Sequence, residues 1–124
     1  MGANRVQRVG VVTREVYTDT MDAMDLAAVD ARLASSPGGG DWSRIGDALQ
    51  RAYAFTDFVH AMRFVNLVAE HAERVQHHPD ILIRYSKVTL TLSTHDANGI
   101  TVKDFDCADE ADRIHARLAA ATAS

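Results

Sequence analysis

The sequence has few of the features that mark exported, membrane-embedded or nucleic-acid-binding proteins. It contains one cysteine, Cys107, so it cannot form an internal disulfide and lacks the paired spacing of disulfide-rich domains and zinc modules. Its 13 basic residues form no run, and the net charge is −4. Nucleic acid is not an expected partner, because binding to phosphates needs clustered Lys and Arg. We expect a cytoplasmic protein.

Long hydrophobic runs are also missing. The longest early apolar stretch, Val9–Val12, is far shorter than a signal-peptide core or a membrane span, so no membrane partner is expected. Arginines on both sides of it leave an organellar transit peptide as a minor alternative. We predict that residues 1–20 are a disordered arm, or arise from an upstream start codon with the working chain beginning near Met21. Residues 21–124 are then long enough to form a single domain.

Glycine and proline are scarce, at 7 and 2 residues, and they gather in Ser35–Gly40, which predicts a loop. Before it, apolar residues spaced by three and four predict a helix over residues 21–34. After it, two short apolar runs, residues 42–45 and 49–55, flank Gly46-Asp47 and predict a β-hairpin.

The most regular pattern covers residues 57–75, where apolar side chains recur at helical spacing and charged ones occupy the other faces. Proline disfavours helical backbone in the residue before it. The helix should therefore end before His77-His78-Pro79, with both histidines on the turn that leaves it.

Residues 81–94 are rich in branched and aromatic side chains and predict two strands. Val88, Leu90 and Leu92 alternate with polar residues, as in a strand with one buried face. The same parity places His95 at the strand end, facing away from the core. A turn over residues 96–99 follows, in which Gly99 is free to adopt a positive φ.

A last helix is predicted after this turn. Thr101 and Asp104 have the spacing of a capping box at its start. Its buried face should consist of Phe105, Ala108, Ala111, Ile114 and Leu118.

Ionisable side chains are concentrated between Glu73 and Asp104, where His77, His78 and His95 also lie. Histidine exchanges protons near neutral pH, since its ordinary pKa is ~6.5. Three histidines with two carboxylates therefore indicate proton-transfer chemistry. A carboxylate bonded to an imidazole fixes its tautomer and favours its protonated form, so Glu73 and Asp104 are expected to orient histidines rather than to react.

The order and spacing of seven residues resemble the signature of the pterin-4a-carbinolamine dehydratases, over about residues 21–120. These residues are Glu73, His77, His78, Pro79, Tyr85, His95 and Asp104. One departure is Ile81, which stands where many family members have tryptophan in the expected wall of the pterin pocket.

The resemblance implies an α+β fold in which a four-stranded antiparallel sheet carries helices on one face. It also implies dehydration of a 4a-hydroxytetrahydropterin to a quinonoid dihydropterin in tetrahydrobiopterin recycling, without a metal or other cofactor. A small-molecule pterin would be the substrate, an aromatic amino acid hydroxylase the pathway partner, and the protein a homodimer or homotetramer.

The site residues implied by the resemblance fall into two groups. His77, His78 and His95 are the predicted catalytic residues, with His78 and His95 as the proton-transfer pair and His77 orienting the substrate. The residues predicted to bind or orient substrate are Glu73, Pro79, Tyr85, Thr94, Asp96 and Asp104.

Several alternatives stay open. The domain could be a noncatalytic protein-binding or assembly module, or a transcriptional coactivator, of the same fold. A zinc site fits poorly, because adjacent histidines followed by proline lack the usual ligand spacing. Tyr85 could be half-buried strand surface, and Asp104 a helix cap. His60, His71 and His115 are expected on the surface, and Cys107 in the core.

Overall fold

The computed structural model describes residues 22–35 and 41–123. In chain order it contains α2 (Leu26–Ser35), β1 (Ser43–Ile45), β2 (Ala48–Ala54), α3 (Phe58–Val75), β3 (Asp80–Arg84), β4 (Lys87–Leu92), the short 3₁₀ helix η2 (His95–Ala97) and α4 (Val102–Ala123). The predicted arm, Met21 and most of the Ser35–Gly40 loop lie outside the described residues. The division into an arm and a domain of residues 21–124 stays a prediction.

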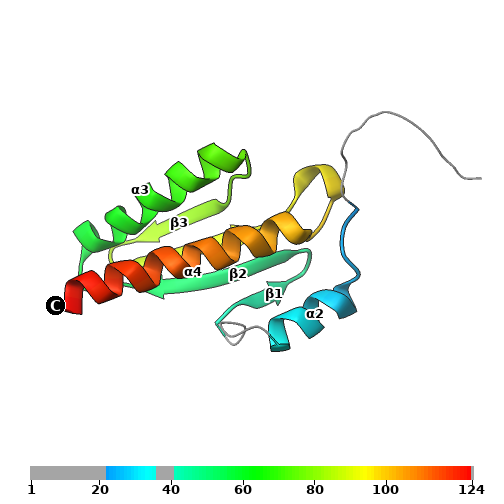
Figure 1. Cartoon of the computed structure of the whole chain (residues 1–124), viewed down its shortest axis with the longest axis horizontal. Coiled ribbons are helices and arrows are strands. Elements are labelled where there is room, and N and C mark those ends of the chain that lie inside the picture. Colours follow the sequence, from blue (N-terminus) through cyan, green and yellow to red (C-terminus); the bar gives the residue numbers. More distant parts are fainter. Residues whose placement is uncertain (1–21, 36–40, 124) are drawn as a thin grey trace, which may run out of the picture.

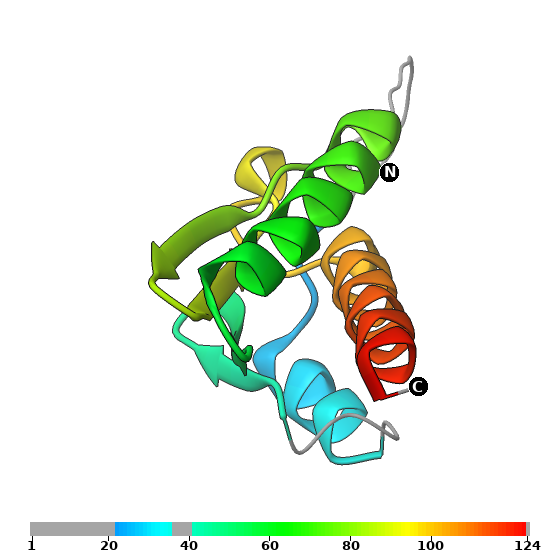
Figure 2. The same cartoon turned by 90° about the vertical axis from the view of Figure 1, so that its left-hand side faces the viewer.

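The strands form a four-stranded sheet in the order β1-β2-β4-β3, and every neighbouring pair is antiparallel. The helices lie on one side of this sheet (Figures 1 and 2). The predicted α+β fold class is therefore confirmed, and so is the hairpin of β1 and β2, whose turn contains Gly46 at φ +59°.

The core lies between the sheet and the helices. The alternation predicted for β4 is confirmed, since Val88, Leu90 and Leu92 are all buried. The predicted face of α4 is buried as well, except that Leu118 is half-buried. The largest fully buried side chains are Tyr53, Phe64, Leu49, Leu90, Leu92 and Ile100.

Helix α3 begins and ends as predicted. Asp57 caps its start by accepting a hydrogen bond from the backbone N–H of His60 (2.9 Å). At its end Gln76 adopts the left-handed conformation, at φ 54° and ψ 46°, and the N–H of His77 bonds the carbonyl of Ala72 (3.1 Å). This turn sends the chain into His77-His78-Pro79 and then into β3.

Helix α2 starts later than predicted, at Leu26 instead of Met21. The reason is a tertiary hydrogen bond: the N–H of Met24 donates to the carbonyl of Ile100 (2.7 Å), which draws this segment alongside a distant part of the chain. The helix is held to β1 by the ion pair of Asp30 with Arg44 (2.8 Å).

The structure differs from expectation at two turns. The positive φ in the turn after η2 belongs to Asn98 (56°) instead of Gly99. Gly99 is needed for a different reason, because a Cβ there would lie only 2.8 Å from the Cβ of Ala23. Tyr85 is not half-buried strand surface: it occupies the β3–β4 turn at φ 54° and is 87% exposed.

A polar cluster on α4, which the sequence did not predict, fixes that helix to the sheet. The carboxylate of Asp112 accepts hydrogen bonds from Trp42 Nε1 (3.1 Å), Arg51 (2.7 Å) and the Tyr53 hydroxyl (2.5 Å). Burial and this carboxylate raise the pKa of the Tyr53 phenol well above its usual range. Tyr53 therefore stays a hydrogen-bond donor at all ordinary pH values.

Candidate active site

One cavity of about 490 Å³ lies where the end of α3, the end of β4, η2 and the start of α4 meet. Its volume is in the range of small-molecule sites. The lining residues are Ala48, Gln76, His77, His78, Asp80, Thr91, Ser93, Thr94, His95, Asp96 and Lys103. All three predicted catalytic histidines thus line one cavity, although His95 comes from a different segment of the chain.

His77 is the buried member of the three, at 9% exposure. Its Nε2 atom lies 2.6 Å from Oδ1 of Asp104, which is fully buried. An ionised carboxylate only accepts hydrogen bonds, so the hydrogen in this bond belongs to the imidazole. The pairing fixes the His77 ring in one orientation and places its tautomeric hydrogen on Nε2.

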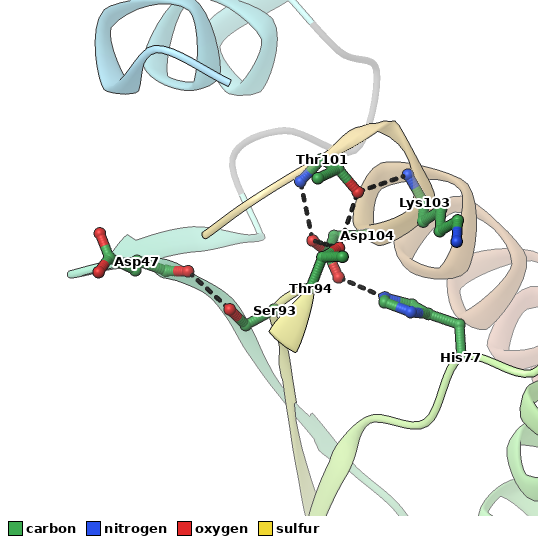
Figure 3. Close-up of polar contacts among 7 residues, drawn as sticks. All are labelled: Asp47, His77, Ser93, Thr94, Thr101, Lys103 and Asp104. Carbon is green, nitrogen blue, oxygen red and sulfur yellow. Dashed lines mark hydrogen bonds and ion pairs between the residues drawn. The ribbon is translucent and has the colours of Figure 1, made fainter. Parts of the chain in front are cut away.

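The other oxygen of Asp104 is held by two donors (Figure 3). Oδ2 accepts from the Thr94 hydroxyl (2.8 Å) and from the backbone N–H of Thr101 (2.9 Å). Because Thr94 uses its hydrogen on Asp104, the 2.7 Å contact between the Thr94 and Thr101 hydroxyls needs Thr101 as the donor. The Thr101 oxygen in turn accepts from the N–H of Lys103 (3.2 Å). Asp104 therefore caps α4 and orients His77 at the same time.

His78 points to a different partner and is mostly exposed. Its Nε2 atom lies 2.7 Å from a carboxylate oxygen of Glu73, one turn back on α3. The hydrogen bond and positive charge of His78 lower the pKa of Glu73. The adjacent rings of His77 and His78 are thus held by separate carboxylates, one buried and one in contact with solvent.

His95 begins η2 and is exposed. Its position depends on a small closed turn, in which the N–H of Thr94 donates to the carbonyl of Gly99 (2.8 Å) and the N–H of Asn98 to that of His95 (3.1 Å). The ring makes no hydrogen bond within residues 22–35 and 41–123. Both of its nitrogens are therefore available to a molecule in the cavity.

The model of the pterin 4 alpha carbinolamine dehydratase family matches residues 22–114, a span that contains every residue of this cavity. The chain belongs to this family.

Two relatives illustrate the similarity, and both bear the name pterin-4-alpha-carbinolamine dehydratase as a provisional assignment. The protein of Thermomicrobium roseum is 52% identical over 84 residues, which are 68% of this chain and 87% of the relative. That of Herpetosiphon aurantiacus is 45% identical over 96 residues, covering 77% of this chain and 97% of the relative. The predicted resemblance to the dehydratase family is confirmed.

Solved structures agree on the fold. The transcriptional coactivator/pterin dehydratase of Brucella melitensis superimposes with a TM-score of 0.68 at 29% identity, over 75% of this chain and 98% of that one. A pterin dehydratase-like RuBisCO assembly factor of the alpha-carboxysome gives a TM-score of 0.50 at 19% identity, over 59% of this chain and 84% of that one. The second likeness concerns the fold alone.

Within this dehydratase fold the predicted substrate-orienting residues divide into three groups. Thr94 and Asp96 line the cavity. Glu73 and Asp104 stand behind it and hold histidines. The remaining two, Pro79 and Tyr85, are absent from its lining: Pro79 borders a small void under His77, and Tyr85 lies on the turn at the opposite end of β3 from Asp80.

The sequence did not predict several lining residues of this dehydratase cavity. Gln76 and Asp80 flank the histidine pair, and Lys103 comes from the first turn of α4. Gln76 could have been suspected as the residue that ends α3. Lys103 could have been suspected as a site residue because it precedes Asp104 in the sequence. Thr91 on the polar face of β4 and Ser93 just after the strand also line the cavity.

The described residues of this dehydratase family member contain no group of three or more His, Cys, Asp or Glu side chains that could hold a metal ion. Within residues 22–35 and 41–123, no helix has the length and apolar character needed to cross a membrane.

Proposed function

We propose that this protein removes water from a 4a-hydroxytetrahydropterin by histidine acid/base catalysis, giving a quinonoid dihydropterin in tetrahydrobiopterin recycling. The observation that supports this proposal is the arrangement of three imidazoles in three different environments around one cavity of about 490 Å³. His77 is buried on Asp104, His78 is exposed on Glu73, and His95 has no bonded partner among the described residues.

The reaction needs a proton on one side of the substrate and a base on the other. The C4a–O bond breaks after the hydroxyl takes up a proton and leaves as water. The lone pair of the neighbouring ring nitrogen forms the new C=N bond, and that nitrogen then loses its own proton. No electron is gained or lost overall. Each positioned proton transfer contributes roughly 10²–10⁴-fold to the rate.

We assign the proton transfers to His78 and His95 because their rings are exposed and can exchange protons with solvent after each turnover. His77 is held by Asp104 with its hydrogen on Nε2, so we assign it to orienting the pterin ring. Asp96 and Thr94 contribute polar atoms to the same wall. Glu73 keeps the His78 ring in place through the 2.7 Å contact.

The test is the ultraviolet absorbance change of 4a-hydroxytetrahydropterin, generated in the assay by a tetrahydropterin hydroxylase, with and without this protein. His78→Ala and His95→Ala should each lower kcat by roughly 10²–10⁴-fold, and His77→Ala should mainly raise KM. His60→Ala is the matched control, because His60 lies in the first turn of α3, at the opposite end of the helix from this cavity. A fully active His78→Ala protein would rule out the proposed roles.

A noncatalytic binding module, such as a coactivator, is the competing proposal. The Brucella protein carries both descriptions in its name. The same assay separates the two: a folded wild-type protein that leaves the spontaneous dehydration rate unchanged would favour the binding module.

We further propose a cytoplasmic homodimer or homotetramer that takes its substrate from an aromatic amino acid hydroxylase. The sheet supports oligomerisation because β1 and β3 are its edge strands, and exposed edges are usually paired or covered. Leu82 on β3 is 55% exposed. Sedimentation equilibrium measures the mass directly, and a monomer at cellular concentrations would contradict this proposal.

A further inference from the structure

A second cavity, of about 450 Å³, lies at the opposite end of α3 from the histidine site. It is bordered by the end of β2 and the loop after it, the first turns of α3, and the last turns of α4. At this end of the molecule α3 and α4 stand apart, as the view along them shows (Figure 2). The lining residues are Ala54, Phe55, Thr56, His60, Arg63, His115, Leu118, Ala119 and Ala121.

The charge of this lining differs from that of the whole chain. The protein has 17 acidic residues and a net charge of −4, yet the described residues of the lining include no Asp or Glu but one arginine, Arg63, and two histidines, His60 and His115. Two carboxylates that act on the histidines of this lining, Asp57 and Asp112, have partners of their own. Asp57 is bonded to the ring (2.6 Å) and backbone of His60, and Asp112 to Trp42, Arg51 and Tyr53.

Two of these three side chains, Arg63 and His115, have no hydrogen-bond or ion-pair partner among the described residues. Arg63 is exposed and forms no ion pair or hydrogen bond within residues 22–35 and 41–123, although its charge adds to that of His60 in acting on Asp57. The ring nitrogens of His115 likewise have no hydrogen-bond partner among the described residues. A guanidinium that faces a hollow without a carboxylate partner is suited to bind an anion in a forked geometry.

The rest of the lining is apolar and aromatic. The ring of His115 packs edge-on against Phe55 (centroids 5.6 Å apart, planes at 80°) and at a tilt against the buried Tyr53 (5.0 Å, 54°), so one wall of the cavity is aromatic. Leu118, Ala119 and Ala121 form the side contributed by α4. Such a surface favours the flat body of an aromatic ligand.

We propose that this second cavity binds a small planar carboxylate, with its carboxylate on Arg63 and its ring against Phe55 and His115. The ligand carries no compensating positive charge, because the described part of the lining offers no carboxylate to pair with one. The volume accommodates a bicyclic acid. The site is separate from the histidine cavity and shares no lining residue with it, so the proposal does not depend on the dehydratase activity.

The experiment uses three probes of one shape and different charge: indole-3-acetate, its neutral amide indole-3-acetamide, and the cation tryptamine. Binding to the full chain is measured by calorimetry and by amide chemical-shift changes. Indole-3-acetate should bind and shift signals around Phe55, Arg63 and Ala119. The amide should bind about tenfold more weakly, as expected for the loss of a charge-assisted hydrogen bond, and tryptamine should not bind.

Two variants test the site, each with a matched control. Arg63→Gln removes the cation and should weaken indole-3-acetate binding about tenfold, whereas Arg74→Gln, at the far end of α3, should not. Ala119→Trp fills the hollow without changing charge and should abolish binding, whereas Ala116→Trp, exposed on α4 outside the lining, should not. Thermal unfolding shows that each variant is folded.

Several results would overturn the proposal. Equal affinity for the acetate and the amide would show that charge plays no part. Displacement of indole-3-acetate by 7,8-dihydrobiopterin, or loss of its binding in His78→Ala, would place it in the histidine cavity. A change of molecular mass in Ala119→Trp would show that the hollow is a subunit contact. No detectable binding of indole-3-acetate to the wild-type protein would also reject the site.

Discussion

Nε2 of His77 and Oδ1 of Asp104 lie 2.6 Å apart, although the two residues are 27 positions apart in the chain. The first follows the end of α3 and the second lies in the first turn of α4. The contact therefore joins the two long helices at the histidine cavity. Since Asp104 is fully buried, water cannot readily replace either partner, and a substitution at one residue leaves the other without its hydrogen bond.

Replacing Asp104 by asparagine should impair catalysis while preserving the shape of the side chain. The single amide oxygen can accept either from Thr94 and Thr101 or from His77, but not from both sides. If it stays with the threonines, its NH₂ group faces Nε2 of His77 and forces the other tautomer. Loss of one charge-assisted hydrogen bond, ~1.5–3 kcal/mol, corresponds to roughly 10–100-fold in kcat/KM. The control is Asp106→Asn, exposed on the same helix. Unchanged kinetics of Asp104→Asn would mean that the pair has no catalytic importance.

Thr94→Val should destabilise the fold, because the substitution replaces a buried hydroxyl with a methyl group of similar size. Asp104 then keeps only the Thr101 N–H on Oδ2, and the Thr101 hydroxyl loses its acceptor. We expect a loss of about 1–3 kcal/mol in the free energy of unfolding, measured by urea denaturation. Thr89→Val, on the open face of β4, should be close to neutral. Equal urea midpoints for the two variants would contradict the importance of this network.

The thiol of Cys107 should be inert in the native protein. Burial, with the negative charges of Asp104 and Asp106, raises its pKa to about 11. At pH 8 it is therefore protonated in the native state, and modification by Ellman's reagent should be slow until denaturant is added. Because the pKa is raised on folding, the unfolded chain releases its proton first as the pH rises. Stability should then fall above about pH 9, and this loss should be smaller in Cys107→Ala. Rapid modification of the native thiol would refute the assignment.

His115 should make the protein less stable in mild acid. Its pKa is lowered, first by burial and then by the charge of Arg51. The unfolded chain binds a proton near the ordinary pKa of ~6.5, whereas the native protein does so only at lower pH. The contribution of the neutral ring to the free energy of unfolding is thus complete above pH ~6.5. It is lost as the pH falls below that value. His115→Gln should narrow the difference in melting temperature between pH 7.5 and 5.5. His71→Gln serves as the control, and an equal narrowing there would contradict this role for His115.

Local rules were enough for much of the fold. The alternation of Val88, Leu90 and Leu92, the proline after His78 and the spacing of Thr101 and Asp104 predicted which residues are buried and where α3 ends and α4 begins. These signals depend on backbone geometry within a few residues, so they survive without knowledge of the rest of the chain. The spacing of the histidines and carboxylates likewise indicates the dehydratase family without knowledge of the tertiary structure.

Other features depend on contacts between distant segments. The approach of Gly99 to Ala23, the late start of α2 and the convergence of Trp42, Arg51 and Tyr53 on Asp112 all join residues far apart in the chain. A local pattern carries no information about such partners, because they meet only after the core has formed.

The histidine cavity combines both kinds of information. Residue types and spacing within the chain identified His77, His78 and His95 as groups for proton transfer, since that chemistry belongs to the side chains themselves. Their separate environments, with Asp104 behind one ring, Glu73 beside another and Lys103 in the same lining, come from packing α3, β4 and α4 together. Burial and hydrogen bonding are properties of that packing, and they are what distinguish one imidazole from the next.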